Sequence, residues 1–397
     1  MISEINIRNF KSIIELQLNL GRVNILIGAN GCGKTNILEA IAIASAANQN
    51  RLDDEYLGAR LRMSDPDFMY TEFNSDEDNA HREVIGISIV QNQKPFYFKL
   101  FYNKALDKWQ DVGENIKNKN VVEDIRWLVE NSSINNLAKH LDGITNLEEV
   151  IKSSDSASEI QEKIPKLFHY FKQELYNNPL LDFFLIFSPE ESNLRKFSDE
   201  TMIRPLGRRG EGMFRHLKEL LTNGDKKKII HALSDGLSLL DWFKGFDIPK
   251  DLFTQEARLD IRDRFLKEAK QVFDQRSTNE GFLYLLFYLT LFNSEKTPSF
   301  FAIDNIETSL NPKLSRRLLQ HLVEVAKKTN KQVIITTHSP YVLDGLDLSD
   351  DEQRLFVVRR NIDGHTKVSR VPYKENRKLP LSEIWMSGVL GGLPDNF

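Results

Sequence analysis

Cysteine is nearly absent from this chain, since Cys32 is the only one among 397 residues. A single thiol excludes an intramolecular disulfide framework and a zinc site built from several cysteines. Long hydrophobic runs are also missing, because no apolar stretch reaches the roughly 18 residues that a membrane-spanning helix needs. The opening segment MISEINIRNFKS lacks the basic and apolar regions of a secretory signal. We therefore expect a cytoplasmic protein that does not enter a membrane.

The net charge of −4 argues against a simple polycation that coats nucleic acid. The charge is nevertheless uneven, with ten acidic residues against three arginines between Asp53 and Glu83. Two basic stretches, Thr201–Ala232 and Gln353–Lys378, each carry eight Lys and Arg residues. Two interpretations stay open for these stretches: solvated faces, or surfaces that bind nucleic acid or an acidic partner.

Apolar periodicity predicts an α/β chain. The first forty residues have the pattern strand, turn, strand, strand, loop and helix, with a buried strand at 23–27 and a helix over 36–47. The last third predicts a helix at 282–292, buried strands at 299–303 and 332–336, an amphipathic helix at 312–328 and a hairpin over 355–371. Between them we expect a hairpin over 84–102, a helix-like polar region over 114–178, an apolar stretch at 180–187 that returns to the core, and helical patterns from the 207–212 loop to about 270.

Residues 28–35, GANGCGKT, fit the phosphate-binding pattern G-x-x-x-x-G-K-[ST] in full. Glycines let successive N–H groups point at phosphate oxygens, and the following helix N-terminus favours an anion. Lys34 can neutralise the β- and γ-phosphates, and the Thr35 hydroxyl can hold Mg²⁺. We therefore predict that ATP is bound by Asn30, Gly31, Cys32, Gly33, Lys34, Thr35 and Asn36.

Two apolar strands downstream end in residues suited to the same site. The segment FFAID places Asp304 at a strand tip, where it can share the Mg²⁺ with Thr35. The segment QVIITTHSP places His338 just past the next strand, where it can sense the γ-phosphate. Lys34 and Asp304 lie 270 residues apart, so a large insertion divides the nucleotide-binding core.

The segments INIRNFKSI, IGANGCGKTNILEAI, FFAIDNIETSLNPKLSRRLLQHL and VIITTHSPYVLDGL resemble the RecF/SMC/OLD-like group of ABC-type ATPases, often grouped with AAA ATPases. The specific resemblance covers residues 1–47 and 276–346. It implies an ABC-type ATPase head with a mixed β-sheet, flanking helices and a split P-loop core. In this group Lys34 and Thr35 match Walker A, Asp304 matches Walker B, residues 309–311 fall at the D-loop and His338 is the H-loop residue. The implied domains are an N-terminal lobe (1–105), a mainly helical insertion or lid (106–270) and a C-terminal lobe (271–397).

The sequence departs from that group after the Walker B aspartate. The group usually has Glu there, to position or deprotonate the attacking water, and this chain has Asn305. Three alternatives stay open: Glu307 supplies the carboxylate, hydrolysis is slow with Asn305, or ATP is bound without turnover.

The signature motif departs as well, since its counterpart here is STNEG at 277–281. Ser277 or Asn279, together with the Gly281 amide, can meet the γ-phosphate of a partner subunit. The alternative is an ordinary helix cap. The glutamine loop of the group has no evident counterpart in the sequence.

The resemblance implies a homodimer that sandwiches ATP, and leaves higher assemblies open. Similar compact proteins are ATPase subunits of bacterial anti-phage systems such as Septu, PARIS and Gabija, where the ATPase senses invasion and holds a separate effector, a nuclease or a toxin. The alternative is a RecF-like DNA-repair ATPase that uses Arg208, Arg209 and Lys226–Lys228 on phosphates. A built-in nuclease is disfavoured, because only about 50 residues follow the H-loop region, where the OLD-type members of the group carry a nuclease domain. The tail Leu381–Phe397 either packs on the core or docks a partner.

Overall fold

The computed structural model describes residues 1–62, 65–71, 84–111, 180–196, 203, 205–223, 226–247, 259–266, 272–375 and 379–393. The helix-like pattern expected over 114–178 lies outside these residues.

A six-stranded sheet forms the centre of the described chain, in the order β14-β13-β3-β12-β11-β7. Its strands are β3 (Val23–Ile27), β7 (Ile186–Phe187), β11 (Phe300–Ile303), β12 (Gln332–Thr336), β13 (Gln353–Arg360) and β14 (Thr366–Val371). Every residue of β3, β11 and β12 is buried, as their apolar runs predict. All neighbours pair in parallel except the β13–β14 hairpin. The carboxyl ends of five strands therefore meet at one edge, and loops leaving these ends lie close together.

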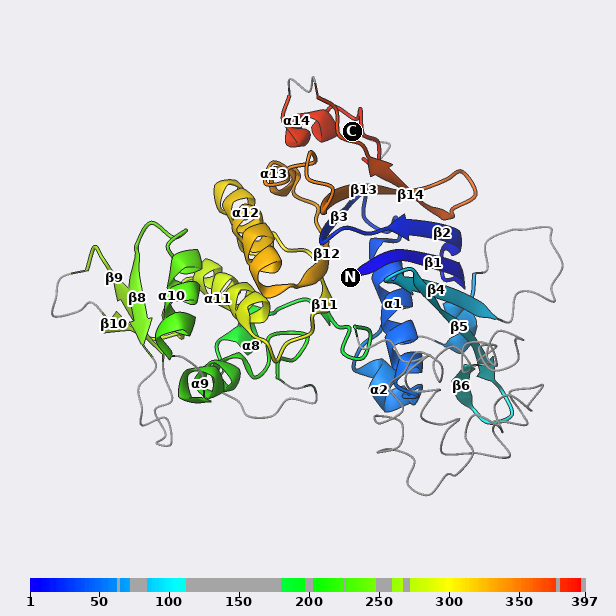
Figure 1. Ribbon diagram of the computed structural model, residues 1–397, viewed down its shortest axis with the longest axis horizontal. Helices are drawn as coiled ribbons and strands as arrows, with labels where there is room; N and C mark the ends of the chain where they lie inside the picture. The colour runs from blue at the N-terminus through cyan, green and yellow to red at the C-terminus, as the bar shows by residue number, and fades with distance from the viewer. Residues whose placement is uncertain are drawn as a thin grey trace, which may run out of the picture.

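A second, antiparallel sheet has the order β2-β1-β4-β5-β6. Its strands are β1 (Ile2–Phe10), β2 (Ile13–Asn19), β4 (Ile85–Gln91), β5 (Lys94–Asn103) and β6 (Lys108–Asp111). Helix α1 (Lys34–Asn48) lies between the two sheets (Figure 1) and contacts strands of both. Alanine and isoleucine dominate α1, and its residues from Ile37 to Ala47 are buried, which suits a helix covered on both sides.

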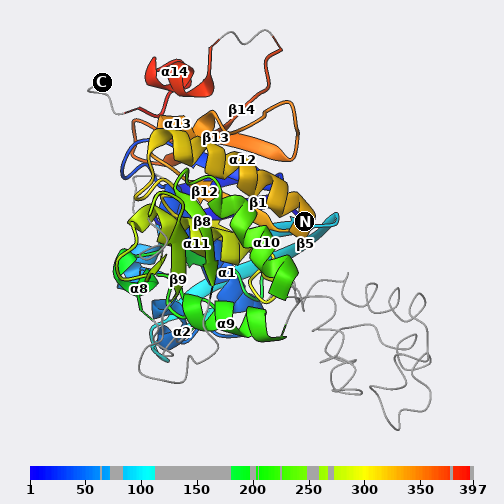
Figure 2. The same cartoon turned by 90° about the vertical axis from the view of Figure 1, so that its left-hand side faces the viewer.

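The opposite face of the central sheet is covered by α11 (Glu280–Asn293) and α12 (Pro312–Thr329), seen to the left of the sheet in Figure 1. Beyond them lie α9 (Met213–Asn223), α10 (Lys226–Leu237) and a three-stranded sheet of β8 (Phe243–Asp247), β9 (Asp260–Asp263) and β10 (Val272–Phe273). In Figure 2, α12 faces the viewer, and α10 and β8 lie in front of α11. The expectation of helix from 213 to about 270 is thus confirmed for α9 and α10 and wrong for β8 and β9. These strands are four or five residues long, so periodicity had too few positions to reveal them.

Five short elements complete the described chain: α2 (Asp54–Gly58), the 3₁₀ turn η1 (Pro66–Met69), α8 (Glu191–Leu194), α13 (Pro340–Leu343) and α14 (Leu381–Met386). In α14, Leu381 and Trp385 are buried against the core, so the tail packs on its own chain as far as it is described. Within the described ranges no helix has both the length and the apolar character needed to cross a membrane.

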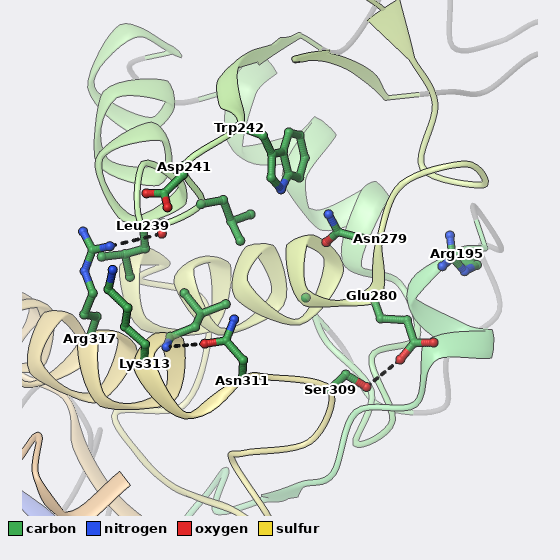
Figure 3. A pocket seen from close by; sticks show the side chains of 13 residues that line it. Arg195, Leu239, Asp241, Trp242, Asn279, Glu280, Ser309, Asn311, Lys313 and Arg317 are labelled. Carbon is green, nitrogen blue, oxygen red and sulfur yellow. Dashed lines mark hydrogen bonds between the residues drawn. The ribbon is translucent and has the colours of Figure 1, made fainter. Parts of the chain in front are cut away.

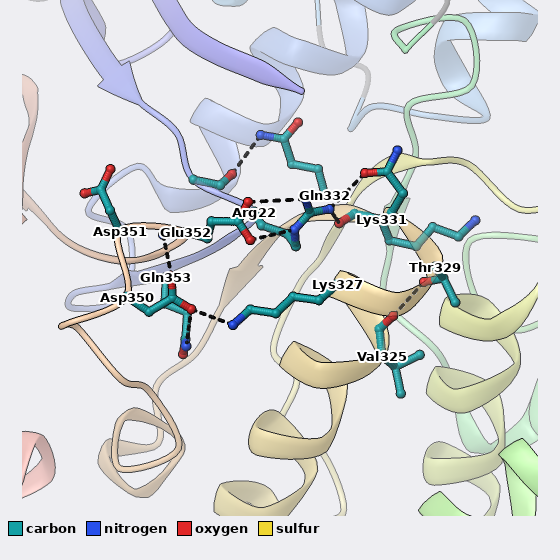
Figure 4. A network of polar contacts seen from close by, with 12 residues as sticks. Arg22, Val325, Lys327, Thr329, Lys331, Gln332, Asp350, Asp351, Glu352 and Gln353 are labelled. Carbon is teal, nitrogen blue, oxygen red and sulfur yellow. Dashed lines mark hydrogen bonds and ion pairs between the residues drawn. The ribbon is translucent and has the colours of Figure 1, made fainter.

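The amino-terminal edge of the parallel strands is joined by a polar network (Figure 4). Arg22 pairs with Glu352 at 2.9 Å, and Lys327 pairs with Asp350 at 2.7 Å. The buried amide of Gln332 donates to the carbonyls of Ile2 (2.7 Å) and Gly21 (2.8 Å) and accepts from the Ile2 N–H (2.8 Å). Gln332 therefore fixes the first strand of one sheet to the central strand of the other.

The predicted strands and helices of both ends are confirmed, as are the 84–102 and 355–371 hairpins. The apolar stretch 180–187 does return to the core, where it forms β7 beside β11. The domain boundaries at 105 and 270 stay predictions. The β6 strand extends the antiparallel sheet past residue 105, and β7 joins the central sheet from within the 106–270 range.

Candidate nucleotide site

The P-loop connects the buried strand β3 to α1 at the carboxyl edge of the central sheet. Gly31 and Gly33 have φ of +73° and +107°, a backbone region that favours glycine. A Cβ on Gly33 would also lie 2.0 Å from the Thr366 Oγ1, so no side chain fits there. Gly33 is the N-cap of α1 and provides no side-chain cap, which leaves the helix N-terminus suited to an anion.

Lys34 lies folded against its own loop. Its Nζ donates to the carbonyls of Gly28 (2.8 Å) and Ala29 (3.0 Å) and is 3.8 Å from the Cys32 Sγ. Burial lowers the pKa of the Lys34 ammonium, and the nearby Cys32 and Asp304 oppose this shift. A cation so poorly solvated interacts more strongly with an incoming phosphate than one in bulk water would.

A chain of hydrogen bonds through two hydroxyl groups holds the backbone of the P-loop. Thr366 of β14 donates to the Cys32 carbonyl at 2.9 Å, and its Oγ1 is 2.7 Å from that of Ser12. Asn36 of α1 donates to the Ser12 hydroxyl at 2.7 Å. Because Thr366 has a single hydroxyl proton, Ser12 must be the donor to it. The amide of Asn36, predicted to contact nucleotide, therefore also fixes the P-loop to the β1–β2 turn and to β14.

Asp304 stands at the end of β11, as its sequence position predicts. The Thr336 hydroxyl at the end of β12 donates to the Asp304 Oδ1 at 2.5 Å and accepts from the Asn305 N–H at 3.0 Å. One threonine thus orients both residues that follow β11. Asn305 has φ of +59°, a conformation that asparagine tolerates better than most residues.

Glu307 is fixed against the H-loop. Its Oε2 accepts from the Thr337 hydroxyl at 2.7 Å, and its Oε1 accepts from the His338 N–H at 2.8 Å. The pKa of the His338 imidazole is lowered by partial burial and by the Lys34 ammonium, so the ring is neutral at pH 7. Each Glu307 oxygen keeps a lone pair free of these two bonds, and the carboxylate can still accept from a water.

Four predicted residues from three distant segments are therefore gathered at one edge. Lys34 interacts electrostatically with Asp304 and Glu307, and His338 interacts with all three. Over the described ranges, no group of three or more His, Cys, Asp or Glu side chains could hold a metal ion by itself. This donor set fits Mg²⁺, which is commonly held by one or two protein oxygens and completed by phosphates and water. Asp304 and Thr35 are the residues that would hold it.

The STNEG segment lies at a different place, beside a pocket of about 670 Å³ at the start of α11 (Figure 3). Asn279 is the N-cap of α11, and its Oδ1 accepts from the Phe282 N–H at 2.9 Å. Ser277 instead donates to the Asp274 side chain at 2.9 Å. Glu280 accepts from the Ser309 hydroxyl of the D-loop position at 2.7 Å. None of the described residues that line this pocket comes from the P-loop.

Arg195 joins this segment to the strand beside β11. It is the C-cap of α8, the short helix after β7, and pairs with Glu191 at 2.7 Å. Its guanidinium donates to the carbonyls of Gln275 (2.8 Å), Arg276 (3.0 Å) and Thr278 (3.0 Å). Because β7 pairs in parallel with β11, the residues after it, 188–191, lie at the same carboxyl edge as Asp304.

Sequence patterns did not identify Arg62, which lies beside α1. Its side chain donates to Glu39 at 2.8 Å and to the Asn36 Oδ1 at 3.5 Å. The hydrogen bond to Glu39 raises the pKa of Arg62, to which the charge of Asp304 also contributes. In the sequence, Arg62 lies in an acidic, turn-rich stretch, and nothing in that stretch indicates that the residue would lie near the P-loop helix.

Comparisons with known proteins indicate the family and the fold of the chain. The family model described as "AAA domain, putative AbiEii toxin, Type IV TA system" matches residues 23–344. The chain is 34% identical over 96 residues to the DNA replication and repair protein RecF of Azobacteroides pseudotrichonymphae genomovar. CFP2. The aligned segment covers 23% of this chain and 25% of that protein. It is 48% identical over 50 residues to the uncharacterized protein MJECL10 of Methanocaldococcus jannaschii, over 12% of this chain and 23% of that protein. The chain thus spans about a quarter of the length of these curated relatives.

A solved structure of an SMC head bound to the C-winged helix domain of ScpA has a similar fold, with a TM-score of 0.54 and 15% sequence identity. The similarity extends over 95% of this chain and 99% of that one. At this identity the likeness concerns the fold alone.

Proposed function

The chain belongs to the AAA-domain family of that description and has the ABC-type ATPase fold of the RecF/SMC group; on this premise we propose that it binds and hydrolyses ATP. The gathering of Lys34, Asp304, Glu307 and His338 at the carboxyl edge of the parallel strands carries this proposal. The P-loop amides and Lys34 bind the phosphates, while Asp304 and Thr35 hold Mg²⁺. When bound, Mg²⁺ neutralises charge on the phosphate oxygens.

Glu307 is the residue we assign to the attacking water. Its two hydrogen bonds to the H-loop fix the direction of the carboxylate, and its remaining lone pairs can orient the water or accept its proton. Asn305 can orient a water but cannot take its proton. Positioning carries most of the catalysis of phosphoryl transfer, so slow hydrolysis supported by Asn305 alone is the competing assignment.

A second copy of the chain completes the site in this proposal. Within one chain the residues Asn279 and Gly281 line a pocket separate from the P-loop. The Asn279 Oδ1 takes up the Phe282 N–H, and the N–H groups of Glu280 and Gly281 at the start of this 14-residue helix are the ones suited to meet an anion. The ATP of one subunit would be held between its own P-loop and the partner's α11 N-terminus, so that ATP joins the homodimer.

The biological role that we favour is a sensor or scaffold that regulates an effector, a nuclease or a toxin, in bacterial anti-phage defence. The family description, which names a putative toxin of a type IV TA system, supports this role. The competing role is a RecF-like ATPase of DNA repair, which the 96-residue match to RecF supports.

The basic residues first considered for DNA give the repair role little further support. Arg208 donates to the carbonyls of Ile186 and Ala59, both at 3.2 Å, and Arg209 pairs with Glu190 at 3.3 Å. Lys226 pairs with Asp247 at 3.5 Å. Arg208 is thus engaged within the chain, whereas Arg209 and Lys226 are largely exposed and form surface ion pairs of little energy.

The proposal is tested by measuring ATP hydrolysis and oligomer mass for the wild type, Asn305→Glu and Glu307→Gln, with and without DNA. Turnover that Glu307→Gln abolishes supports the assignment of Glu307. Turnover that survives in Glu307→Gln assigns the water to Asn305. Assembly with ATP but without turnover, restored by Asn305→Glu, would replace the enzyme by an ATP-locked scaffold. Stimulation by DNA would favour the repair role.

A further inference from the structure

The described end of the chain, Leu381–Leu393, forms what we term the C-terminal strap. It begins with α14 and continues through a glycine-rich segment, SGVLGGL. Gly388, Gly391 and Gly392 have φ of +78°, +73° and +76°, so the backbone follows a path that other residues rarely adopt.

The first half of the strap is fixed to the segment that follows the H-loop. The Asp344 carboxylate accepts from the Ser382 N–H at 3.0 Å and from its hydroxyl at 2.7 Å. Asp344 directly follows α13, which begins two residues after His338. Trp385 is buried at the same place. The glycine-rich half is less enclosed, since its residues are exposed or half-buried.

The glycine-rich half of the strap reaches Gly28, the first glycine of the P-loop. A Cβ built on Gly392 would lie 2.7 Å from the Val357 Cγ1 and 3.5 Å from the Cα of Gly28. A Cβ built on Gly28 would lie 2.1 Å from the Val358 carbonyl oxygen. Gly28 is therefore enclosed between β13 and the strap, with no room for a side chain on either partner.

Gly28 also accepts a hydrogen bond from the ammonium that is expected to meet the phosphate. Its carbonyl accepts from the Lys34 Nζ at 2.8 Å. The ammonium has three N–H donors, and a bound phosphate competes with the loop carbonyls for them, because a bond between two ionised groups is stronger than one from an ammonium to a neutral carbonyl. A Gly28 carbonyl that loses this partner is free to reorient, and the surface on which Gly392 packs would then change with it.

We propose that the C-terminal strap is a nucleotide sensor, which packs on Gly28 while Lys34 is bonded to the P-loop carbonyls and is released when ATP draws Lys34 away. This inference rests on the proposed binding of ATP. It gives the fold a route from the phosphate site to the protein surface, where Met386 and Val389 of the strap are exposed. Coupling of this kind is reciprocal, so a strap that cannot pack on Gly28 must raise the affinity for ATP.

The chain offers a matched pair of variants for the test. Gly392→Ala places a methyl group against Val357 at a positive φ, and should detach the glycine-rich half. Gly391→Ala introduces the same backbone strain, but its Cβ meets no atom within 4 Å. Amide hydrogen exchange of the P-loop and strap peptides is measured in the full chain with and without a non-hydrolysable ATP analogue. The affinity for that analogue is measured by calorimetry.

We expect the analogue to protect the P-loop and to speed exchange in the strap by about fivefold or more, at the lower end of ordinary allosteric coupling. Gly392→Ala should show fast strap exchange without nucleotide and bind the analogue at least about fivefold more tightly, while Gly391→Ala behaves as the wild type. P-loop protection without any change in the strap, or equal behaviour of the two variants, overturns the sensor. Absence of P-loop protection would instead refute ATP binding itself.

Discussion

Replacing Thr366 by valine should damage the P-loop from a strand more than 330 residues further along the chain. Thr366 is fully buried, and its hydroxyl is the last donor in the relay from Asn36 through Ser12 to the Cys32 carbonyl. Valine has nearly the same shape but neither donates nor accepts. The variant therefore removes two buried hydrogen bonds with little change in packing.

The magnitude follows from what is left without a partner. The Cys32 carbonyl loses a donor in a buried position, which costs about 1–3 kcal/mol. The Ser12 hydroxyl loses its acceptor but keeps the bond from Asn36, so its cost is at the low end of that range. We expect Thr366→Val to lower the free energy of unfolding by about 2 kcal/mol and to weaken ATP binding, because the P-loop backbone is no longer held.

Urea unfolding and ATP titration check this expectation, with Thr366→Ser as the control. Serine keeps the relay and loses one methyl group, worth about 1 kcal/mol of burial. The reasoning requires Thr366→Ser to retain the affinity for ATP and to be the more stable of the two variants. If Thr366→Val is as stable as the wild type, or if Thr366→Ser is the worse of the two, packing and not hydrogen bonding supports the loop.

Three further outcomes are expected. Glu307→Gln should lower kcat by about 100-fold or more while ATP still binds, since the amide orients a water but takes no proton; equal turnover would assign the water elsewhere. His216, buried with its Nε2 2.8 Å from the Ser294 hydroxyl, has a pKa lowered by burial to about 4. Its contribution to stability is complete above the unfolded pKa of about 6.5 and is lost as pH falls toward 4, so the wild type should lose about 1.3 kcal/mol more than His216→Gln between pH 7.5 and 5.5 in urea unfolding. A flat difference would show that the imidazole takes up its proton as readily in the fold as in the unfolded chain. Gln332→Leu removes the three hydrogen bonds of the buried amide to Ile2 and Gly21 and should cost about 3 kcal/mol in the same assay, without changing the carboxyl edge of the parallel strands; a loss below about 1 kcal/mol would contradict the role given to this residue.

The sequence predicts the candidate nucleotide site because short apolar runs end in residues suited to phosphate and Mg²⁺. Three buried strands are recognisable in the sequence, at Val23–Ile27, Phe300–Ile303 and Gln332–Thr336. Parallel pairing brings the residues that follow them to one edge of the central sheet. Asp304 and His338 could therefore be placed beside Lys34 without knowledge of the contacts between them.

The residues that hold this edge in shape were not predictable in the same way. Thr336 looks like the last residue of a strand, and Thr366 like the first residue of a hairpin strand. Their roles arise from pairings across more than 30 and more than 330 positions, which leave no local pattern. The same is true of Gly392, whose contact with Gly28 depends on the path of the last strap residues.

Equilibrium binding of ATP with Mg²⁺ to the wild type and to Lys34→Ala tests the central claim most directly. Circular dichroism and thermal unfolding of both proteins establish that the variant is folded. The structure predicts binding by the wild type and a loss of about 30-fold or more in Lys34→Ala, equivalent to one charge-assisted bond to phosphate. Equal affinity in the two proteins would contradict the assignment of residues 28–35 as the phosphate site.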